Sequence, residues 1–190
     1  LREWSATDGI DLRSFWSRRF RRLLAASWLT MALVVVMGAL GAWDDSQMRD
    51  LRGDVPWSLA ELANWHFIAK GTSYGASQSP PSPLEHFWSL AIEQQFYILL
   101  PLLLVGLLVR GRGTPRRRLR STLGVLAALG VASAVANGWF ARTSIDRAYF
   151  GTDTRAAELI AALLLAGFLL RRLRLHGRIR QLALVAGAVG

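Results

Sequence analysis

The sequence predicts an all-α fold, a polytopic transmembrane helix bundle with four complete spans and a truncated fifth. Of the 190 residues, 52% are apolar, and they form long blocks with the charges gathered between them. A soluble domain needs charge along every surface element, whereas blocks of about 18 or more apolar residues are typical of bilayer spans. Arginine clusters alternate with the blocks, as in multi-pass membrane proteins.

The chain is predicted to be a single membrane domain and a fragment of a longer protein. Its predicted spans cover residues 23–43, 87–109, 121–141, 148–170 and, as the truncated fifth, 181–190. The last run is too short for a bilayer core, which needs about 20 residues. The first span carries no charge and ends at Trp43, where an interfacial aromatic is expected. Small residues of the third span are expected to allow close helix packing. They are Gly124, Ala127, Ala128, Val131 and Ala132.

Arginine placement predicts the orientation. Sixteen of the 23 Lys and Arg residues fall in three segments without Asp or Glu. The positive-inside rule therefore places residues 1–22, 110–120 and 171–180 in the cytoplasm, and 44–86 and 142–154 outside. A nucleic-acid-binding protein would need its arginines on one folded face and would leave the apolar blocks unexplained. The expected surroundings are the lipid bilayer of the cell membrane, with no nucleic-acid partner.

Composition also excludes several kinds of chemistry. There is no cysteine, which rules out a disulfide framework, a thiol nucleophile and a cysteine-ligated metal. The three histidines, His66, His86 and His176, are too dispersed to suggest a metal site. Neither a metal nor a bound cofactor is therefore expected.

The outer segment, residues 44–86, is long for a connection. Within it, residues 57–68 could form a short helix on the membrane interface, and residues 71–83 have the composition of a turn or loop. Long loops in compact proteins are often functional. A tether with no role of its own is the alternative reading.

The first arginine cluster is predicted to lie on an interfacial helix capped by Asp11. One face is apolar and carries Leu12, Phe15, Trp16, Phe20 and Leu23. The opposite face carries Arg13, Arg18, Arg21 and Arg22. Arg19 interrupts the apolar face, and the membrane orientation of the chain alone does not require an arginine at this position. The cluster either sets the topology and contacts lipid head groups, or it binds a phosphate-bearing donor. The second alternative is chemically reasonable because guanidinium groups match phosphate geometry.

The second span begins with an unusual number of polar residues. His86, Ser89, Glu93 and Tyr97 are spaced so that they form one stripe along a helix. A carboxylate within a span costs roughly 2.5–3.5 kcal/mol at the bilayer centre. The stripe is therefore expected to face a bundle interior or a wet cavity. It either holds helices together by hydrogen bonds or lines a substrate cavity.

The fourth span opens with a charged pair. Arg155 and Glu158 are neighbours at i and i+3 on a helix. They are expected to form an ion pair within the helix. Alternatively, Arg155 pairs with Glu93 across helices, because both are predicted near the outer ends of their spans.

Four segments together resemble the acyltransferase 3 family of integral membrane acyltransferases, which O-acetylate surface polysaccharides and other exported glycans. They read FWSRRFRRLL (15–24), NWHFI (64–68), PLEHFWSLAIEQQFY (83–97) and YFGTDTRAAEL (149–159). The third segment is the most specific. Two positions depart from the family pattern, namely Ala25, where proline is usual, and Gln94, where glutamate is usual. The second departure leaves Glu93 as the single acid of that motif.

The resemblance implies acyl transfer across the membrane. Acyl-CoA, as a co-substrate, would bind from the cytoplasm near Arg18, Arg19 and Arg22. The acyl group, acetyl in the first instance, would pass to a hydroxyl of an exported glycan or lipid-linked acceptor by general base catalysis. The substrate cavity would be lined by His86, Trp88, Ser89, Glu93, Tyr97, Arg155 and Glu158.

The resemblance also implies that the catalytic histidine lies in a span that precedes this chain. The catalytic residue is therefore unknown here, and the chain alone is expected to be inactive. Two other classes compete with this interpretation. A transporter or flippase would also explain Glu93 and Arg155 within spans, but it predicts broken helices or internal repeats. A membrane scaffold without activity is the other.

Overall fold

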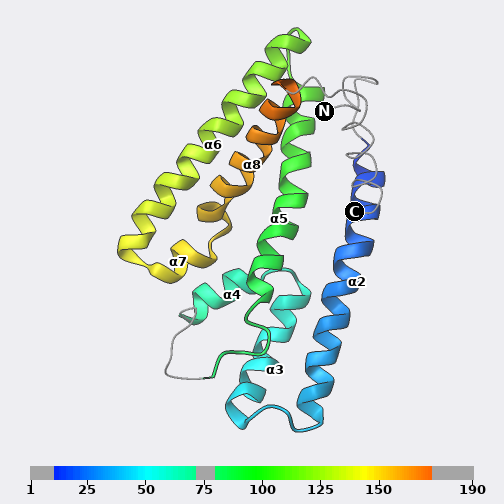
Figure 1. The fold of residues 1–190 in the computed structure, drawn as a ribbon, viewed down its shortest axis with the longest axis vertical. Coiled ribbons are helices and arrows are strands. Elements are labelled where there is room, and N and C mark those ends of the chain that lie inside the picture. The colour runs from blue at the N-terminus through cyan, green and yellow to red at the C-terminus, as the bar shows by residue number, and fades with distance from the viewer. Residues whose placement is uncertain (1–10, 72–79, 173–190) are drawn as a thin grey trace.

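The computed structural model describes residues 11–71 and 80–172, and all regular structure in these ranges is helical (Figure 1). This confirms the predicted all-α bundle. The helices are α2 (Leu12–Ala39), α3 (Asp45–Leu59), α4 (Ala63–Lys70), α5 (Phe87–Leu104), the π-helical turn η1 (Val105–Val109), α6 (Pro115–Thr143), α7 (Ile145–Phe150) and α8 (Thr152–Arg172).

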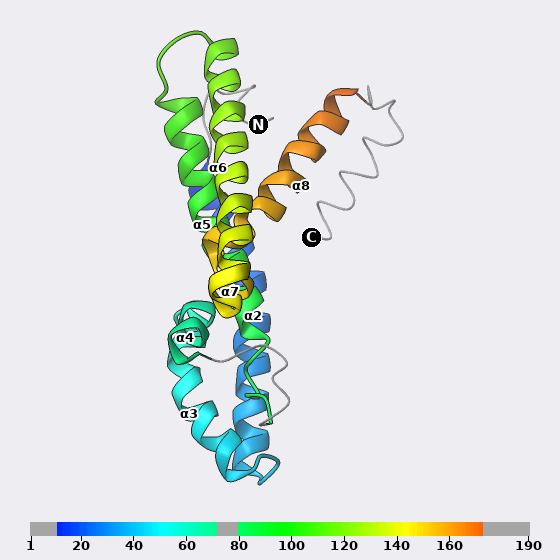
Figure 2. The same cartoon turned by 90° about the vertical axis from the view of Figure 1, so that its left-hand side faces the viewer.

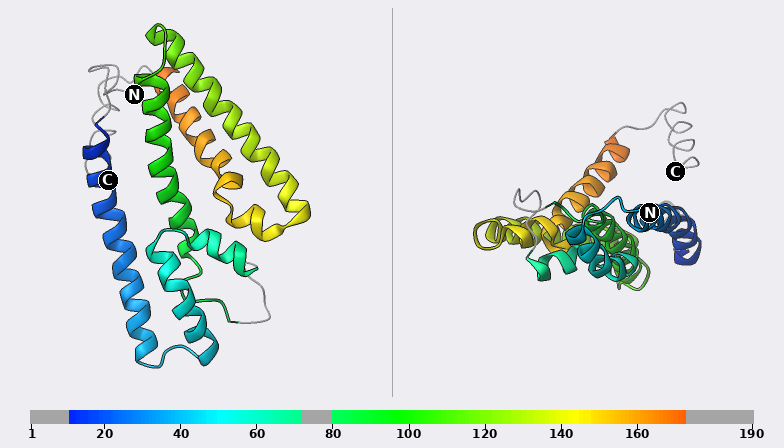
Figure 3. Two further views of the ribbon diagram at one scale, coloured as in Figure 1. Left: turned by 180° about the vertical axis from the view of Figure 1, so that it is seen from behind. Right: turned by 90° about the horizontal axis from the view of Figure 1, so that it is seen from below.

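Three of the described helices are long and apolar enough to cross a membrane: α2, α5 continued through η1, and α6. The predicted fourth span, 148–170, is divided at Gly151 between α7 and α8, and α8 is not one of the three. The predicted fifth span lies outside the described residues. α5 runs between α2 on one side and α6 to α8 on the other (Figures 1 and 3).

The interfacial helix and the first span form one continuous helix, α2. Its start is confirmed by the cap, because the Asp11 carboxylate accepts a hydrogen bond of 3.0 Å from the Ser14 N–H. The predicted apolar face of its first turns is half-buried, whereas the arginines of the opposite face are exposed. Beyond the end of α2, the Trp43 indole donates back to the Val34 carbonyl over 2.9 Å.

The segment predicted to lie outside, residues 44–86 and called the outer segment below, contains two helices, α3 and α4. A capping box between Asp44 and Gln47 begins α3. The expected single helix over 57–68 is wrong, because the chain breaks between the two helices and Glu61 has a left-handed φ of 56°. Of the predicted loop, residues 72–79 lie outside the described residues.

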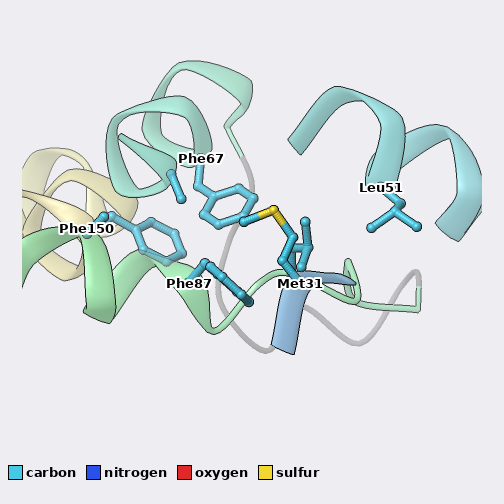
Figure 4. Close-up of a cluster of buried hydrophobic side chains, with 8 residues drawn as sticks. Met31, Leu51, Phe67, Phe87 and Phe150 are labelled. Carbon is cyan, nitrogen blue, oxygen red and sulfur yellow. The ribbon is translucent and has the colours of Figure 1, made fainter. Parts of the chain in front are cut away.

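A cluster of buried apolar side chains joins this outer segment to the bundle (Figure 4). Met31 comes from α2, Leu51 from α3, Phe67 from α4, Phe87 from α5 and Phe150 from the end of α7. The rings of Phe67 and Phe150 have centroids 5.8 Å apart. Full burial of such a side chain contributes about 1.5–3 kcal/mol, so the cluster fixes the start of α5 against α4 and α7.

The packing of α6 differs from the prediction. The five small residues that were expected to allow close helix packing are all exposed in the described structure. The buried residues of α6 are Thr122, Leu126 and Ser133, and with Gly130 they recur at intervals of three or four residues. The Ser133 hydroxyl accepts a hydrogen bond of 2.9 Å from the Ala157 N–H of α8. At Gly130 an added Cβ would lie 3.3 Å from the Ile160 side chain. α8 is inclined to α5 and α6 (Figure 2).

Candidate functional site

The first arginine cluster meets α5 at Tyr97. The indole N–H of Trp16 donates to the Tyr97 carbonyl over 2.9 Å. The guanidinium carbon of Arg19 lies 4.0 Å from the centroid of the Tyr97 ring, within the range of a cation–π interaction. Arg19 interrupts the apolar face of α2 because that face packs on α5 here. Its Nε is buried without a hydrogen-bond partner among the described residues.

This contact places the first cluster beside the middle of α5. Tyr97 precedes Arg110 by thirteen residues, which corresponds to roughly 20 Å along a helix axis. The end of α5 and the start of α6 lie together, and the end of α8 lies at the same end of the molecule but apart from them, whereas α2 begins level with the middle of α5 (Figures 1 and 2). The three arginine-rich helix ends thus point in one direction without being level. Arg18 is exposed, and Arg22 also has an exposed side chain.

Three of the four residues in the polar stripe of α5 are exposed, and the fourth contacts α2. His86, Ser89 and Glu93 are exposed, and Tyr97 is half-buried beneath Arg19. The Ser89 hydroxyl donates to the His86 carbonyl over 3.1 Å. Within the described ranges, His86, Ser89 and Glu93 thus do not face the bundle interior, which was one of the two expected positions, and a wet cavity along the stripe stays a prediction. Helix geometry gives the reason, since residues two apart lie about 200° apart, and the interior takes Gln95 in place of Glu93.

Gln95 is the centre of a partly buried hydrogen-bond network. Its amide N–H groups donate to the Asn64 side-chain oxygen at 2.9 Å and to the Glu61 carbonyl at 2.8 Å. Its oxygen accepts from the Trp65 indole at 3.1 Å and from the Thr152 hydroxyl at 2.6 Å. Both ends of the amide are thus satisfied, as a buried polar group requires. The network ties α4, α5 and α8 together.

Asn64 extends this network to the turn between α7 and α8. Its side-chain N–H groups donate to the Phe150 carbonyl and to the Thr152 hydroxyl, both at 2.9 Å. Asn64 is fully buried. At the same turn an added Cβ on Gly151 would lie 2.6 Å from Thr154 Oγ1 and 2.7 Å from the Arg147 carbonyl oxygen. The turn therefore accepts only glycine at that position.

Arg155 is held in place from several sides. It forms an ion pair of 2.6 Å with Glu158 on its own helix, and its Nε donates to the Tyr149 carbonyl over 3.0 Å. Its guanidinium carbon lies 4.9 Å from the Tyr149 ring centroid and 5.8 Å from that of Trp88. The intrahelical pair is confirmed. The alternative pair with Glu93 does not form in the described structure.

An open cavity of about 360 Å³ lies beside this arginine. It is formed by the end of α6, by α7 and by the first turns of α8. Its lining residues are Ala134, Asn137, Ile145, Ala148, Tyr149, Thr154, Arg155, Ala157 and Glu158. Of the residues predicted to line a substrate cavity, Arg155 and Glu158 line this one. Trp88 is not among its lining residues, but its ring lies next to the Arg155 guanidinium.

A second polar cluster holds the outer segment. Asp54 is completely buried and bonds the His66 ring nitrogen at 2.9 Å and the Ser82 hydroxyl. Lys70 lies 3.4 Å from Asp54 and 2.6 Å from Asp50. Burial by itself lowers the pKa of Lys70, but the hydrogen bond to Asp50 and the two carboxylate charges outweigh it and raise that pKa. The cluster fastens α3, α4 and the residues that lead into α5.

Glu61 is the most perturbed acid of the outer segment. Burial raises the pKa of its carboxyl to about 7, because a charged carboxylate loses hydration there. Its Oε1 is buried without a hydrogen-bond partner in the described structure. Residues 11–71 and 80–172 contain no group of three or more His, Asp or Glu side chains arranged to hold a metal ion.

Sequence reasoning did not single out the residues at the centres of these networks. Gln95 and Asn64 lie within two of the family-like segments, and Asp54 stands in the outer segment. The sequence feature that could have indicated them is an amide side chain within an apolar helix, because such a group needs hydrogen-bond partners when it is buried. The identity of those partners depends on helices distant in sequence.

Comparison with known proteins places the chain among acyltransferases. A family model described as an acyltransferase domain matches residues 5–190. The chain is 37% identical over 171 residues to the peptidoglycan O-acetyltransferase OatA of Listeria monocytogenes, covering 87% of this chain and 26% of that protein. It is 41% identical over 160 residues to YrhL of Bacillus subtilis, provisionally named a peptidoglycan O-acetyltransferase, covering 83% and 24%.

A further relative is a Staphylococcus aureus protein provisionally named an O-acetyltransferase, 36% identical over 170 residues, with coverage of 87% and 26%. The chain spans about a quarter of the length of the curated relatives it matches. No solved structure matches the chain.

Proposed function

The chain belongs to the acyltransferase 3 family, and from this premise we propose that it serves to move an acyl group from cytoplasmic acyl-CoA to a hydroxyl of an exported or surface glycan. Listeria OatA, its relative, is named as a peptidoglycan O-acetyltransferase. Peptidoglycan is accordingly the first acceptor to test, and acetyl the first acyl group. The reaction would take place at the cell membrane, with acyl-CoA as a co-substrate.

The donor would bind at the start of α2. Arg18, Arg19 and Arg22 would bind the phosphates of acyl-CoA, since guanidinium groups form strong, paired hydrogen bonds with phosphate oxygens. Arg19 is already oriented by Tyr97 at 4.0 Å, and its Nε has no protein partner in the described structure. An oriented arginine loses little side-chain entropy when a phosphate binds.

One relationship carries the proposal: Arg19 and Arg155 lie against aromatic rings of the same helix. Their rings, Tyr97 and Trp88, are nine residues apart on α5, roughly 14 Å along its axis. A bilayer core is about 30 Å thick. A donor at Arg19 and an acceptor near Arg155 would therefore be separated by less than half a bilayer, a distance that the long pantetheine arm of CoA suits.

The chemistry would be transfer of the acyl carbon from sulfur to oxygen. The thioester C–S bond breaks, an ester C–O bond forms, and the hydroxyl proton leaves to a general base while CoA departs as the thiol or thiolate. The family resemblance assigns the base to a histidine, and none of the described residues is assigned that role. The described residues would hold the two substrates, with Glu93 and Ser89 on the exposed face of α5 between the levels of Tyr97 and Trp88.

The proposal is tested with labelled acetyl-CoA. Sealed inverted membrane vesicles that contain the full protein receive the donor from the cytoplasmic face, and esterified glycan is measured in the lumen. Label in alkali-labile glycan ester supports acyl transfer. Flux of an intact glycan or lipid-linked precursor without ester formation would favour the transporter reading and overturn the proposal.

A further inference from the structure

The cavity between α6, α7 and α8 offers a binding site whose chemistry selects its ligand. Its walls come from Asn137 near the end of α6, Tyr149 of α7, and Arg155 and Glu158 of α8. α7 and the parts of α6 and α8 that adjoin it lie away from the arginine-rich start of α6 and end of α8 (Figure 1). Its volume, about 360 Å³, falls within the range of small-molecule sites.

The charges at this cavity are balanced. Arg155 is paired with Glu158 at 2.6 Å, and the nearby Arg147 is paired with Asp153 at 2.8 Å. A phosphate or carboxylate ligand would have to compete with these acids for the guanidinium groups. An uncharged ligand with many hydroxyls has no such conflict, because it can donate to carboxylate oxygens and accept from guanidinium N–H groups at once.

The polar groups retain capacity for a ligand. Arg155 has five N–H donors, of which Nε is used by the Tyr149 carbonyl and one Nη1 hydrogen by Glu158. The Glu158 side chain is 67% exposed and is bonded through Oε1, which leaves Oε2 as an acceptor. Asn137 donates through its amide nitrogen to the Ala148 carbonyl at 3.2 Å, and its side-chain oxygen is a further acceptor.

The site is also organised before a ligand arrives. Arg155 is fixed by the Tyr149 carbonyl and by the rings of Tyr149 and Trp88. The α7–α8 turn beneath it is fixed by Thr154, whose hydroxyl lies 2.8 Å from the Gly151 carbonyl oxygen and 3.0 Å from that of Ala148. Groups that are already ordered bind with a smaller entropic cost.

We propose that this cavity binds an uncharged sugar ring of the acceptor glycan, with Glu158 and Arg155 hydrogen-bonded to its hydroxyl groups. This inference rests on the proposed function and names the acceptor's position within it. It makes Glu158 and Arg155 specificity-determining residues for a neutral glycan over a phosphorylated one.

The test measures sugar binding separately from acyl transfer. The full protein in lipid nanodiscs is titrated with N,N′-diacetylchitobiose, a neutral disaccharide, and with N-acetylglucosamine 1-phosphate, and each Kd is measured by calorimetry. Glu158→Ala is expected to weaken disaccharide binding by about tenfold or more. Asp153→Ala is the matched control, because Asp153 is also an α8 carboxylate paired with an arginine, Arg147 of α7, but does not line the cavity. It should change Kd by less than about twofold.

Three results would overturn the inference: no measurable disaccharide binding, tighter binding of the phosphorylated sugar, or equal effects of the two substitutions. Glu158→Gln, which keeps the shape of the side chain, decides the matter if the alanine variant does not fold. Binding that depends on Glu158 without any acyl transfer would overturn the proposed function alone. Acyl transfer with an acceptor KM unchanged by Glu158→Ala would overturn the sugar site alone.

Discussion

The guanidinium of Arg19 lies over the ring of Tyr97, with its carbon 4.0 Å from the ring centroid. Beside it the Trp16 indole donates to the Tyr97 carbonyl over 2.9 Å. The two contacts dock the start of α2 against the middle of α5. An arginine of the first cluster is thereby placed alongside the helix whose other end touches Arg155 through Trp88.

Arg19→Ala is expected to weaken acyl-CoA binding by about 10- to 100-fold, because a charge-assisted hydrogen bond contributes about 1.5–3 kcal/mol. Arg117→Ala, an exposed arginine at the start of α6, should have less than about a threefold effect. Binding of a non-hydrolysable acyl-CoA analogue to the full protein in nanodiscs measures both. Equal losses of acyl-CoA affinity in the two variants would mean that the first cluster determines topology and does not bind the donor.

Gln95→Ala should lower the free energy of unfolding by about 2–4 kcal/mol, because the Asn64 side-chain oxygen, the Trp65 indole N–H and the Glu61 carbonyl each lose the partner that Gln95 supplies. Gln94 is the matched control, since it is 3% exposed and its Oε1 has no partner among the described residues. Gln94→Leu should be neutral or stabilising. Thermal unfolding in the same detergent compares them, and a larger loss at Gln94 would contradict the assigned network.

Asp54→Ala is expected to destabilise the protein by about 3 kcal/mol or more, because it strips a buried acceptor from His66, Lys70 and Ser82. Asp50 also pairs with Lys70, at 2.6 Å, but its side chain is 35% exposed. Asp50→Ala should therefore cost less than about 1 kcal/mol. Chemical denaturation distinguishes the two, and similar losses would mean that burial of Asp54 adds nothing.

Glu61 should make stability depend on pH. Burial raises the pKa of its carboxyl to about 7 in the folded protein, from an ordinary value of 4.5. The folded state therefore holds this proton more tightly, so its contribution is complete below about pH 4.5 and is lost as pH rises through 7. Glu61→Gln should remove this part of the pH dependence of the melting temperature. An unchanged profile would show that the carboxylate is adequately hydrated.

Gly151→Ala should destabilise the turn between α7 and α8, because the new Cβ would lie 2.7 Å from the Arg147 carbonyl oxygen, a backbone atom. A loss of about 1–3 kcal/mol is expected, as for other overpacked sites. Gly138 of α6 is the control, since an added Cβ there meets nothing within 4 Å. Gly138→Ala should stabilise the helix by up to about 1 kcal/mol. Melting temperatures that move in the same direction would contradict the crowding at Gly151.

The sequence alone determined the features that depend on neighbours along the chain. Long apolar blocks predicted helices able to cross a membrane, and α2, α5 and α6 have that character. Asp11 predicted the start of α2, because a cap acts within one helical turn. The Arg155–Glu158 pair followed from i, i+3 spacing for the same reason. The family-like segments predicted the acyltransferase family, which the domain match confirms.

The tertiary structure decided which polar residues meet. Glu93 and Gln95 are both polar residues of one helix, yet only Gln95 faces the interior, because α4 and the start of α8 pack on that side of α5. The small residues of α6 that were expected to pack closely are exposed because α8 packs on a different face of α6. The position of Arg19 beside Tyr97 depends on how far α2 slides along α5, which interactions between distant residues set and local pattern does not.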